Sequence, residues 1–125
     1  MLTGIDTSFF YALAAGRPLA AAAWENRELL TAAPCFYELQ KKLLQGDLRS
    51  WPTVLEDIAR AVEVAPVTAA AALKAGQIAH STGMPALDAI ILSSLVEAGC
   101  EEILTLDHHF TLFAKAGLKI TLLSS

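Results

Sequence analysis

Short apolar runs that alternate with helical segments constrain the fold of this 125-residue chain more than any other feature. Four runs rich in apolar and β-branched residues are expected to form strands, at residues 2–6, 62–67, 102–107 and 118–123. Because helical segments separate these runs, the strands must be joined by crossover connections and lie mainly parallel. The pattern therefore predicts an α/β fold, a three-layer α/β/α sandwich with a mainly parallel central sheet.

The helical segments are recognised by their apolar spacing, by proline near their starts and by glycine after their ends. We expect helices over residues 8–15, 19–30, 34–45, 52–61, 68–80, 85–98 and 108–116. The chain shows no internal repeat or evident linker, and its length is typical of one hydrophobic core. A single domain over residues 1–125 is expected.

The composition limits the classes of protein to which the chain can belong. No apolar run reaches the roughly 20 residues that span a bilayer, and no basic region precedes an apolar stretch at the N-terminus. We therefore expect a cytoplasmic protein with no membrane partner. Cys35 and Cys100 are far apart and lack a nearby second cysteine, which favours buried free thiols. The net charge of −4 disfavours polyanions, so nucleic-acid binding would need a local basic patch or bound cations.

Two carboxylates stand where predicted strands end. Asp6 follows the first strand and Asp107 ends the run "EILTLD". In open α/β sheets, ligands bind beyond the carboxyl ends of the strands, so these two side chains are expected at one edge. Each also precedes a predicted helix, where aspartate is a favourable N-cap. The sequence alone leaves both interpretations open.

A third carboxylate, Asp88, lies within an apolar helical stripe. In "MPALDAIILSSLVEAG" it shares a face with Met84, Ile91 and Leu95. A carboxylate in such a place costs several kcal/mol unless it is paired. A bound cation or a neighbouring polar site would explain it, while the helix dipole offers a structural alternative.

Glu38 is not distinguished by this test. Helical spacing places it beside Lys41 and Lys42 and away from Phe36 and Leu39. The pattern alone predicts a solvated Glu38–Lys42 pair worth only about a few tenths of a kcal/mol.

Four motifs together resemble those of a known family. "GIDTSFFYAL", "PCFYELQKKL", "MPALDAIILSSLVEAG" and "ILTLDHHF" are similar, in order and spacing, to motifs of the PIN-domain ribonucleases, with the VapC-type toxins of bacterial toxin–antitoxin pairs most similar. The resemblance covers nearly the whole chain, from Asp6 to the terminal strand. It implies a Mg²⁺- or Mn²⁺-dependent endoribonuclease (a hydrolase), the toxin of a type II toxin–antitoxin system.

The resemblance also implies roles for individual residues, and it replaces the surface interpretation of Glu38. The implied catalytic and metal-binding residues are Asp6, Glu38, Asp88 and Asp107. Ser8 and Thr105 match small polar positions that support the metal site.

The two histidines after the last aspartate mark a departure from the family pattern. Many relatives carry a further acid where this chain has His109, which favours one bound ion over two. His108 and His109 are adjacent and cannot share a helix face, which argues against a two-histidine zinc site. His109 is a supporting candidate that contacts substrate or a leaving group; an ordinary polar role in a first helical turn is the alternative.

The first two predicted helices are apolar on more than one face. The residues responsible are Phe9, Phe10, Tyr11, Leu13, Leu19 and Trp24. An exposed apolar patch marks an interaction site, and the resemblance implies a groove for a VapB-like antitoxin here and a homodimer. Alternatively these residues fill the core. Candidates for contact with RNA phosphates are Arg17, Arg27, Lys41, Lys42, Arg49 and Arg60.

Two other functions remain as alternatives. One is a catalytically degenerate PIN-like binding or scaffold protein that acts through its apolar N-terminal helices; the four carboxylates count against it and His109 counts for it. The other is a phosphate-accepting receiver domain or a phosphatase. This alternative ranks last. The first strand is followed by "DTS" and not by a D-x-D motif, and the chain has no glycine-rich phosphate loop.

Overall fold

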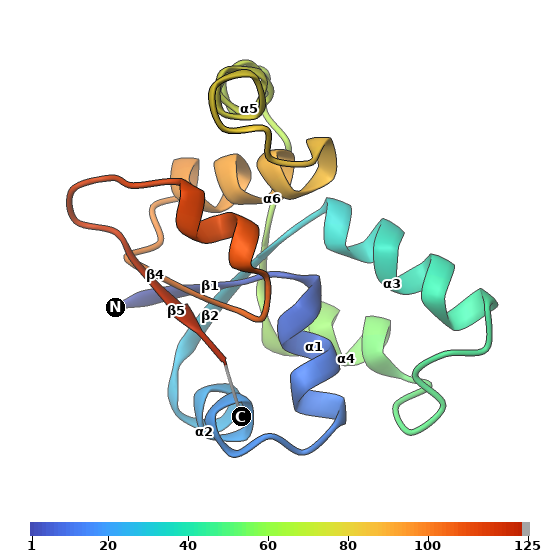
Figure 1. The fold of residues 1–125 in the computed structure, drawn as a ribbon. Helices are drawn as coiled ribbons and strands as arrows, with labels where there is room; N and C mark the ends of the chain where they lie inside the picture. The colour runs from blue at the N-terminus through green and yellow to red at the C-terminus, as the bar shows by residue number, and fades with distance from the viewer. Residues whose placement is uncertain (124–125) are drawn as a thin grey trace.

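The computed structural model describes residues 1–123, and a five-stranded parallel sheet lies at its centre (Figure 1). The strand order is β3-β2-β1-β4-β5, and every neighbouring pair is parallel. The strands are β1 (Leu2–Ile5), β2 (Glu28–Ala32), β3 (Glu63–Ala65), β4 (Glu102–Thr105) and β5 (Lys119–Leu122). The predicted fold class is confirmed.

Helices cover both faces of the sheet. They are α1 (Thr7–Ala14), α2 (Pro18–Asn26), α3 (Pro34–Leu44), α4 (Val54–Ala61), α5 (Ala69–Thr82), α6 (Ala86–Glu97) and the 3₁₀-helix η1 (His108–Leu112). Figure 1 shows α6 and, outside it, α5 on one side of the sheet, with α1 and α2 on the other. The helix α3 contributes Cys35 to the core on the α6 side and Leu39 to the core on the α1 side.

The sheet separates two hydrophobic cores, as expected when both faces of parallel strands are covered. Ile103 and Leu104 are neighbours in β4 and point into opposite cores. The largest buried side chains on the α6 side include Leu30, Ile91, Leu92, Leu95 and Phe110. Those on the α1 side include Ile5, Phe9, Phe10 and Ile58. Cys35 and Cys100 are free and buried, as predicted.

Two predicted elements are wrong in extent. The expected helix over 19–30 ends at Asn26, and residues 28–32 form β2, a central strand that the prediction missed. Its apolar stretch is buried on both faces, and such a run cannot be distinguished from a buried helix by periodicity. The expected helix over 108–116 is a 3₁₀-helix that ends at Leu112. Across residues 1–123, no helix is both long enough and apolar enough to cross a membrane.

The helix α3 offers a matched test of the packing. Leu39 is fully buried against α1 and α4, whereas Leu44, in the last turn, is 79% exposed. We expect Leu39→Ala to lower the free energy of unfolding by about 2–5 kcal/mol, because it leaves a cavity between packed helices. The same substitution at Leu44 should cost less than about 1 kcal/mol. Urea denaturation of both variants measures the difference, and equal losses would contradict this packing.

Candidate active site

Asp6 is buried at the carboxyl end of the central strand. β1 ends at Ile5, and Asp6 is the N-cap of α1. Its Oδ1 accepts hydrogen bonds from the Ser8 hydroxyl (2.7 Å) and the Phe9 backbone N–H (3.2 Å). Its Oδ2 accepts one from the Thr105 hydroxyl at 2.7 Å. Only 5% of Asp6 is exposed, so these donors fix the orientation of the carboxylate.

The neighbouring strand β4 brings a second carboxylate to the same edge. The backbone N–H of Asp107 donates to the Thr105 hydroxyl (2.9 Å), and that of Leu106 donates to the Ser8 hydroxyl (2.8 Å). Asp107 is also the N-cap of η1, since its Oδ1 accepts from the His109 N–H at 2.9 Å. The capping and site interpretations are therefore compatible for Asp6 and Asp107, because each caps a helix and still faces the same edge.

Asp88 and His109 approach Asp107 from different elements. Asp88 is in the first turn of α6, where its side chain is 24% exposed. The His109 Nδ1 lies 2.9 Å from Asp107 Oδ1 and 3.5 Å from Asp88 Oδ2. These three residues offer ligand atoms that all lie within 4.8 Å of one another.

Glu38 faces the site rather than solvent. It accepts a hydrogen bond from the Thr7 hydroxyl across the gap between α3 and α1. Among residues 1–123, the carboxylate that pairs with the Lys42 amine is that of Asp47, at 4.0 Å, and not that of Glu38. The Glu38–Lys42 pair that the pattern predicted is therefore wrong. Sequence reasoning also missed Thr7, although it occupies the middle of "DTS" after the first strand.

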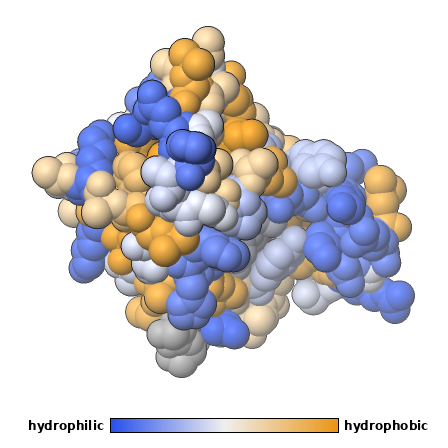
Figure 2. All heavy atoms as spheres, turned by 45° about the horizontal axis from the view of Figure 1, so that its top comes forward, coloured by the Kyte–Doolittle hydropathy of each residue, from blue (hydrophilic) through white to orange (hydrophobic). Residues whose placement is uncertain are grey.

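One cavity of about 310 Å³ brings together all four acids that the resemblance singled out. Its lining includes Asp6, Glu38, Asp88 and Asp107, together with Thr7, Ser8, Tyr11 and Lys42. We call it the acidic cavity. Thr105 lies behind Asp6, to which it is hydrogen-bonded. Figure 2 shows hydrophilic residues gathered on the right, the side of the molecule where Figure 1 places α3.

The environment of the acidic cavity disfavours full ionisation of its carboxylates. Burial raises the pKa of Asp6 to about 6, against the opposing hydrogen bonds from Thr105 and Ser8. Burial, then the neighbouring Asp107, raises the pKa of Asp88 to about 7. Negative charge is thus crowded here, and a cation would relieve the crowding.

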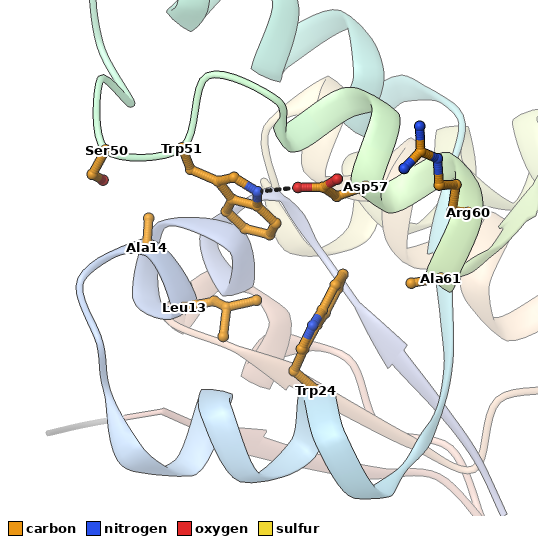
Figure 3. A pocket seen from close by; sticks show the side chains of 8 residues that line it. All are labelled: Leu13, Ala14, Trp24, Ser50, Trp51, Asp57, Arg60 and Ala61. Carbon is orange, nitrogen blue, oxygen red and sulfur yellow. Dashed lines mark hydrogen bonds between the residues drawn. The ribbon is translucent and has the colours of Figure 1, made fainter.

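A second pocket lies at the last turn of α1, where α2, α4 and the segment before α4 surround it (Figure 3). Its volume is about 560 Å³, and its lining is Leu13, Ala14, Trp24, Ser50, Trp51, Asp57, Arg60 and Ala61. The Trp24 and Trp51 rings meet edge to face with centroids 5.7 Å apart, and Trp51 Nε1 donates to Asp57 Oδ2 at 2.6 Å. We call it the tryptophan pocket.

The apolar residues of the N-terminal helices were expected either to form an exposed interaction patch or to fill the core, and the structure shows some of each. Phe9 and Phe10 are fully buried and belong to the core. Leu13 and Trp24 line the pocket instead, and Leu19 is 54% exposed.

Comparison with known proteins identifies the family. The family model described as "PIN domain" matches residues 5–116, most of the chain. The chain belongs to the PIN-domain family. Among curated proteins, none matches its sequence.

Solved structures share the architecture of this PIN domain. VapBC-1 from nontypeable Haemophilus influenzae superposes with a TM-score of 0.76 at 17% identity, covering 98% of each chain. VapBC-5 from Mycobacterium tuberculosis gives 0.72 at 24% identity, covering 97% of this chain and 98% of that one. VapC20 from M. tuberculosis, described as a Sarcin-Ricin loop cleaving toxin, gives 0.68 at 21%, covering 87% and 92%. At these identities the likeness shows the fold alone.

The raised pKa values predict how the stability of the metal-free PIN domain depends on pH. As pH rises above about 4, the unfolded chain loses the Asp6 proton, while the folded protein keeps it until about pH 6. Ionised Asp6 therefore destabilises the fold, and Asp6→Asn should gain stability relative to the wild type as pH rises through this window. The relative gain should reach at most about 3 kcal/mol.

Urea unfolding in EDTA at pH 4, 5.5 and 7.5 measures this difference. Asp47→Asn, which alters an exposed carboxylate outside the acidic cavity, serves as the matched control and should show no comparable gain. If the free energy of unfolding of Asp6→Asn changed with pH in parallel with that of the wild type over this range, the raised pKa of Asp6 would be refuted.

Proposed function

We propose that this PIN domain is a metal-dependent endoribonuclease that hydrolyses phosphodiester bonds of RNA. The observation that carries the proposal is the convergence of Asp6, Glu38, Asp88 and Asp107 in one cavity. Asp6 follows β1, Glu38 lies in α3, Asp88 lies in α6 and Asp107 follows β4. Residues distant in sequence therefore meet in one place. A cluster of carboxylates whose pKa values are raised, as those of Asp6 and Asp88 are, is typical of a functional site.

The donor set fits a small divalent cation. Mg²⁺ and Mn²⁺ prefer carboxylate oxygens and keep several of their waters, so two or three protein ligands suffice. Asp88, Asp107 and His109 present ligand atoms close together, and Asp6 lines the same cavity. The His109 nitrogen suits Mn²⁺ better than Mg²⁺. A bound ion would supply an acidified water and would neutralise charge on the phosphate.

The chain's own residues have separable roles in this proposal. Asp6, Asp88 and Asp107 hold the cation, directly or through water. Glu38 lines the same cavity and, held by a hydrogen bond from Thr7, orients the attacking water or binds as an outer ligand. Ser8 and Thr105 support the site indirectly, since both donate to Asp6 and set its direction.

RNA cleavage tests the proposal. With Mg²⁺ or Mn²⁺, wild-type protein should cleave RNA, and EDTA should abolish cleavage. Asp6→Asn and Asp88→Asn should each lower the rate by about 10²–10³-fold, since each weakens the hold on the cation. Glu101→Gln, which alters an exposed acid before β4 at the opposite edge of the sheet, should leave the rate unchanged. Cleavage that survives chelation, or both substitutions, would sink the proposal.

We further propose that the chain is the toxin of a toxin–antitoxin pair and that a VapB-like antitoxin binds at the tryptophan pocket. The pocket supports this, because its tryptophans offer large apolar contacts and its rim carries Asp57 and Arg60. Related folds occur in toxin–antitoxin complexes, including one from Klebsiella pneumoniae. A homodimer, which the resemblance implies, belongs to the same proposal.

Disruption of the tryptophan pocket should separate antitoxin binding from catalysis. Trp24→Ala should weaken binding of the proposed VapB-like antitoxin by at least about 2 kcal/mol, roughly 30-fold, because it removes an aromatic anchor. Metal-dependent cleavage by the free variant should be retained. Isothermal titration calorimetry and the cleavage assay measure the two effects. Leu73→Ala, an equally apolar but distant exposed site on α5, is the control. Unchanged antitoxin affinity in Trp24→Ala would exclude this docking site.

A further inference from the structure

A surface along α3 leads away from the acidic cavity and carries an aromatic ring one helical turn before two lysines. We propose that this surface binds the single-stranded RNA segment next to the scissile phosphate, with a base stacked on Tyr37 and phosphates held by Lys41 and Lys42. The inference rests on the proposed nuclease function and adds to it a means of positioning the substrate. We call the surface the α3 track; its residues are Tyr11, Tyr37, Glu38, Lys41, Lys42, Gln45 and Leu87, so two lysines stand against one acid.

The α3 track is continuous with the acidic cavity. A hollow of about 240 Å³ lies beside the cavity, and the two share Tyr11, Glu38 and Lys42 as common walls. A third hollow of about 340 Å³ continues along the helix and shares Tyr37, Lys41 and Gln45 with the second. An RNA strand with one phosphate at the carboxylates can therefore extend along α3 and stay within a concave surface.

The charge of the α3 track suits a polyanion, although the chain as a whole carries −4. Within residues 1–123, Lys41 forms no ion pair, and Lys42 has only a distant contact with Asp47 at 4.0 Å. Arg27, by contrast, is paired with Glu102 at the opposite edge of the sheet. The lysines of the α3 track are thus available for phosphates, and they lie beside the proposed scissile bond.

Lysines alone would suit any polyanion, and Tyr37 is the residue of the α3 track that favours single-stranded RNA. Its side chain is 61% exposed on α3, although an aromatic ring gains from burial. Tyr37 and Lys41 are four residues apart and share a helix face, so a base on the ring would place its phosphates near the amine. Stacking on an exposed aromatic ring is worth about 1–3 kcal/mol per base and tolerates any base.

Tyr11 joins the α3 track to the site. It is half-buried and lines both the acidic cavity and the adjoining hollow. Its phenol hydroxyl is a hydrogen-bond donor at physiological pH, as for any tyrosine. A donor at this junction can bind a phosphate or ribose oxygen as the strand passes.

Binding of a labelled RNA tests the α3 track separately from cleavage. The probe is a fluorescein-labelled single-stranded RNA of about twelve nucleotides, titrated in Mg²⁺ with protein carrying Asp6→Asn so that it stays intact. On this background, Tyr37→Ala should weaken binding by about 5- to 150-fold, and Tyr37→Phe should restore it, because stacking needs the ring and not the hydroxyl. Lys41→Gln should reduce the slope of log affinity against log salt by about one.

The control and a second readout complete the design. Lys74→Gln, an exposed lysine on α5, should change neither affinity nor salt slope. In cleavage by otherwise wild-type protein, Tyr37→Ala should raise KM and leave kcat nearly unchanged, as expected for a positioning residue.

Several outcomes would overturn the proposal that the α3 track binds RNA. They are unchanged RNA affinity in Tyr37→Ala, an equal loss in Tyr37→Phe, and a change in oligomeric state of Tyr37→Ala by light scattering, which would assign the surface to a second copy of the chain. Failure of the nuclease proposal looks different, since the wild type would then show no metal-dependent cleavage at all.

Discussion

Burial of the Asp6 carboxylate at the end of the central strand is the constraint around which this PIN domain is arranged. A carboxylate that is 5% exposed needs donors, and here they come from the first turn of α1 and from the end of β4. Since the Thr105 hydroxyl also accepts from the Asp107 N–H, the hydrogen bonds that satisfy Asp6 also position Asp107. The geometry of the two acids follows from the need to satisfy one of them.

A second buried acid, Glu102, shows how differently the two edges of the sheet treat negative charge. Glu102 lies at the amino edge, where burial is outweighed by hydrogen bonds from Thr121 and Arg27 and by the charge of Arg27, so its pKa lies below the usual value. Within residues 1–123, the donors to Asp6 are two hydroxyls and a backbone N–H, all uncharged, and burial raises its pKa. Glu102 is thus paired directly with an arginine, whereas Lys42 lines the acidic cavity without forming a hydrogen bond to Asp6, and this contrast supports the proposed metal ion at the carboxyl edge.

The sequence predicted the sheet class and most elements because strand and helix periods are local properties. It did not predict β2, since a strand buried on both faces has no alternating pattern and follows directly on an alanine-rich helix. Glu38 illustrates the limit for the site. Its helical neighbours are polar, so the pattern indicated solvent, yet it faces a cavity whose other wall, at Thr7, is 31 residues distant in sequence. Only the resemblance, which carries tertiary information, placed it with the other acids.

The short helix α1 connects the three surfaces proposed to have function. Its first turn holds Ser8 beside Asp6, its middle presents Tyr11 to the α3 track, and its last turn gives Leu13 to the tryptophan pocket. Eight residues of α-helix extend about 12 Å, and four residues of extended chain cover about the same distance. A partner anchored in the tryptophan pocket therefore needs only a short extension to reach the acidic cavity. In the proposed toxin–antitoxin pair, such an extension would occupy the proposed path of the RNA without any change in the fold.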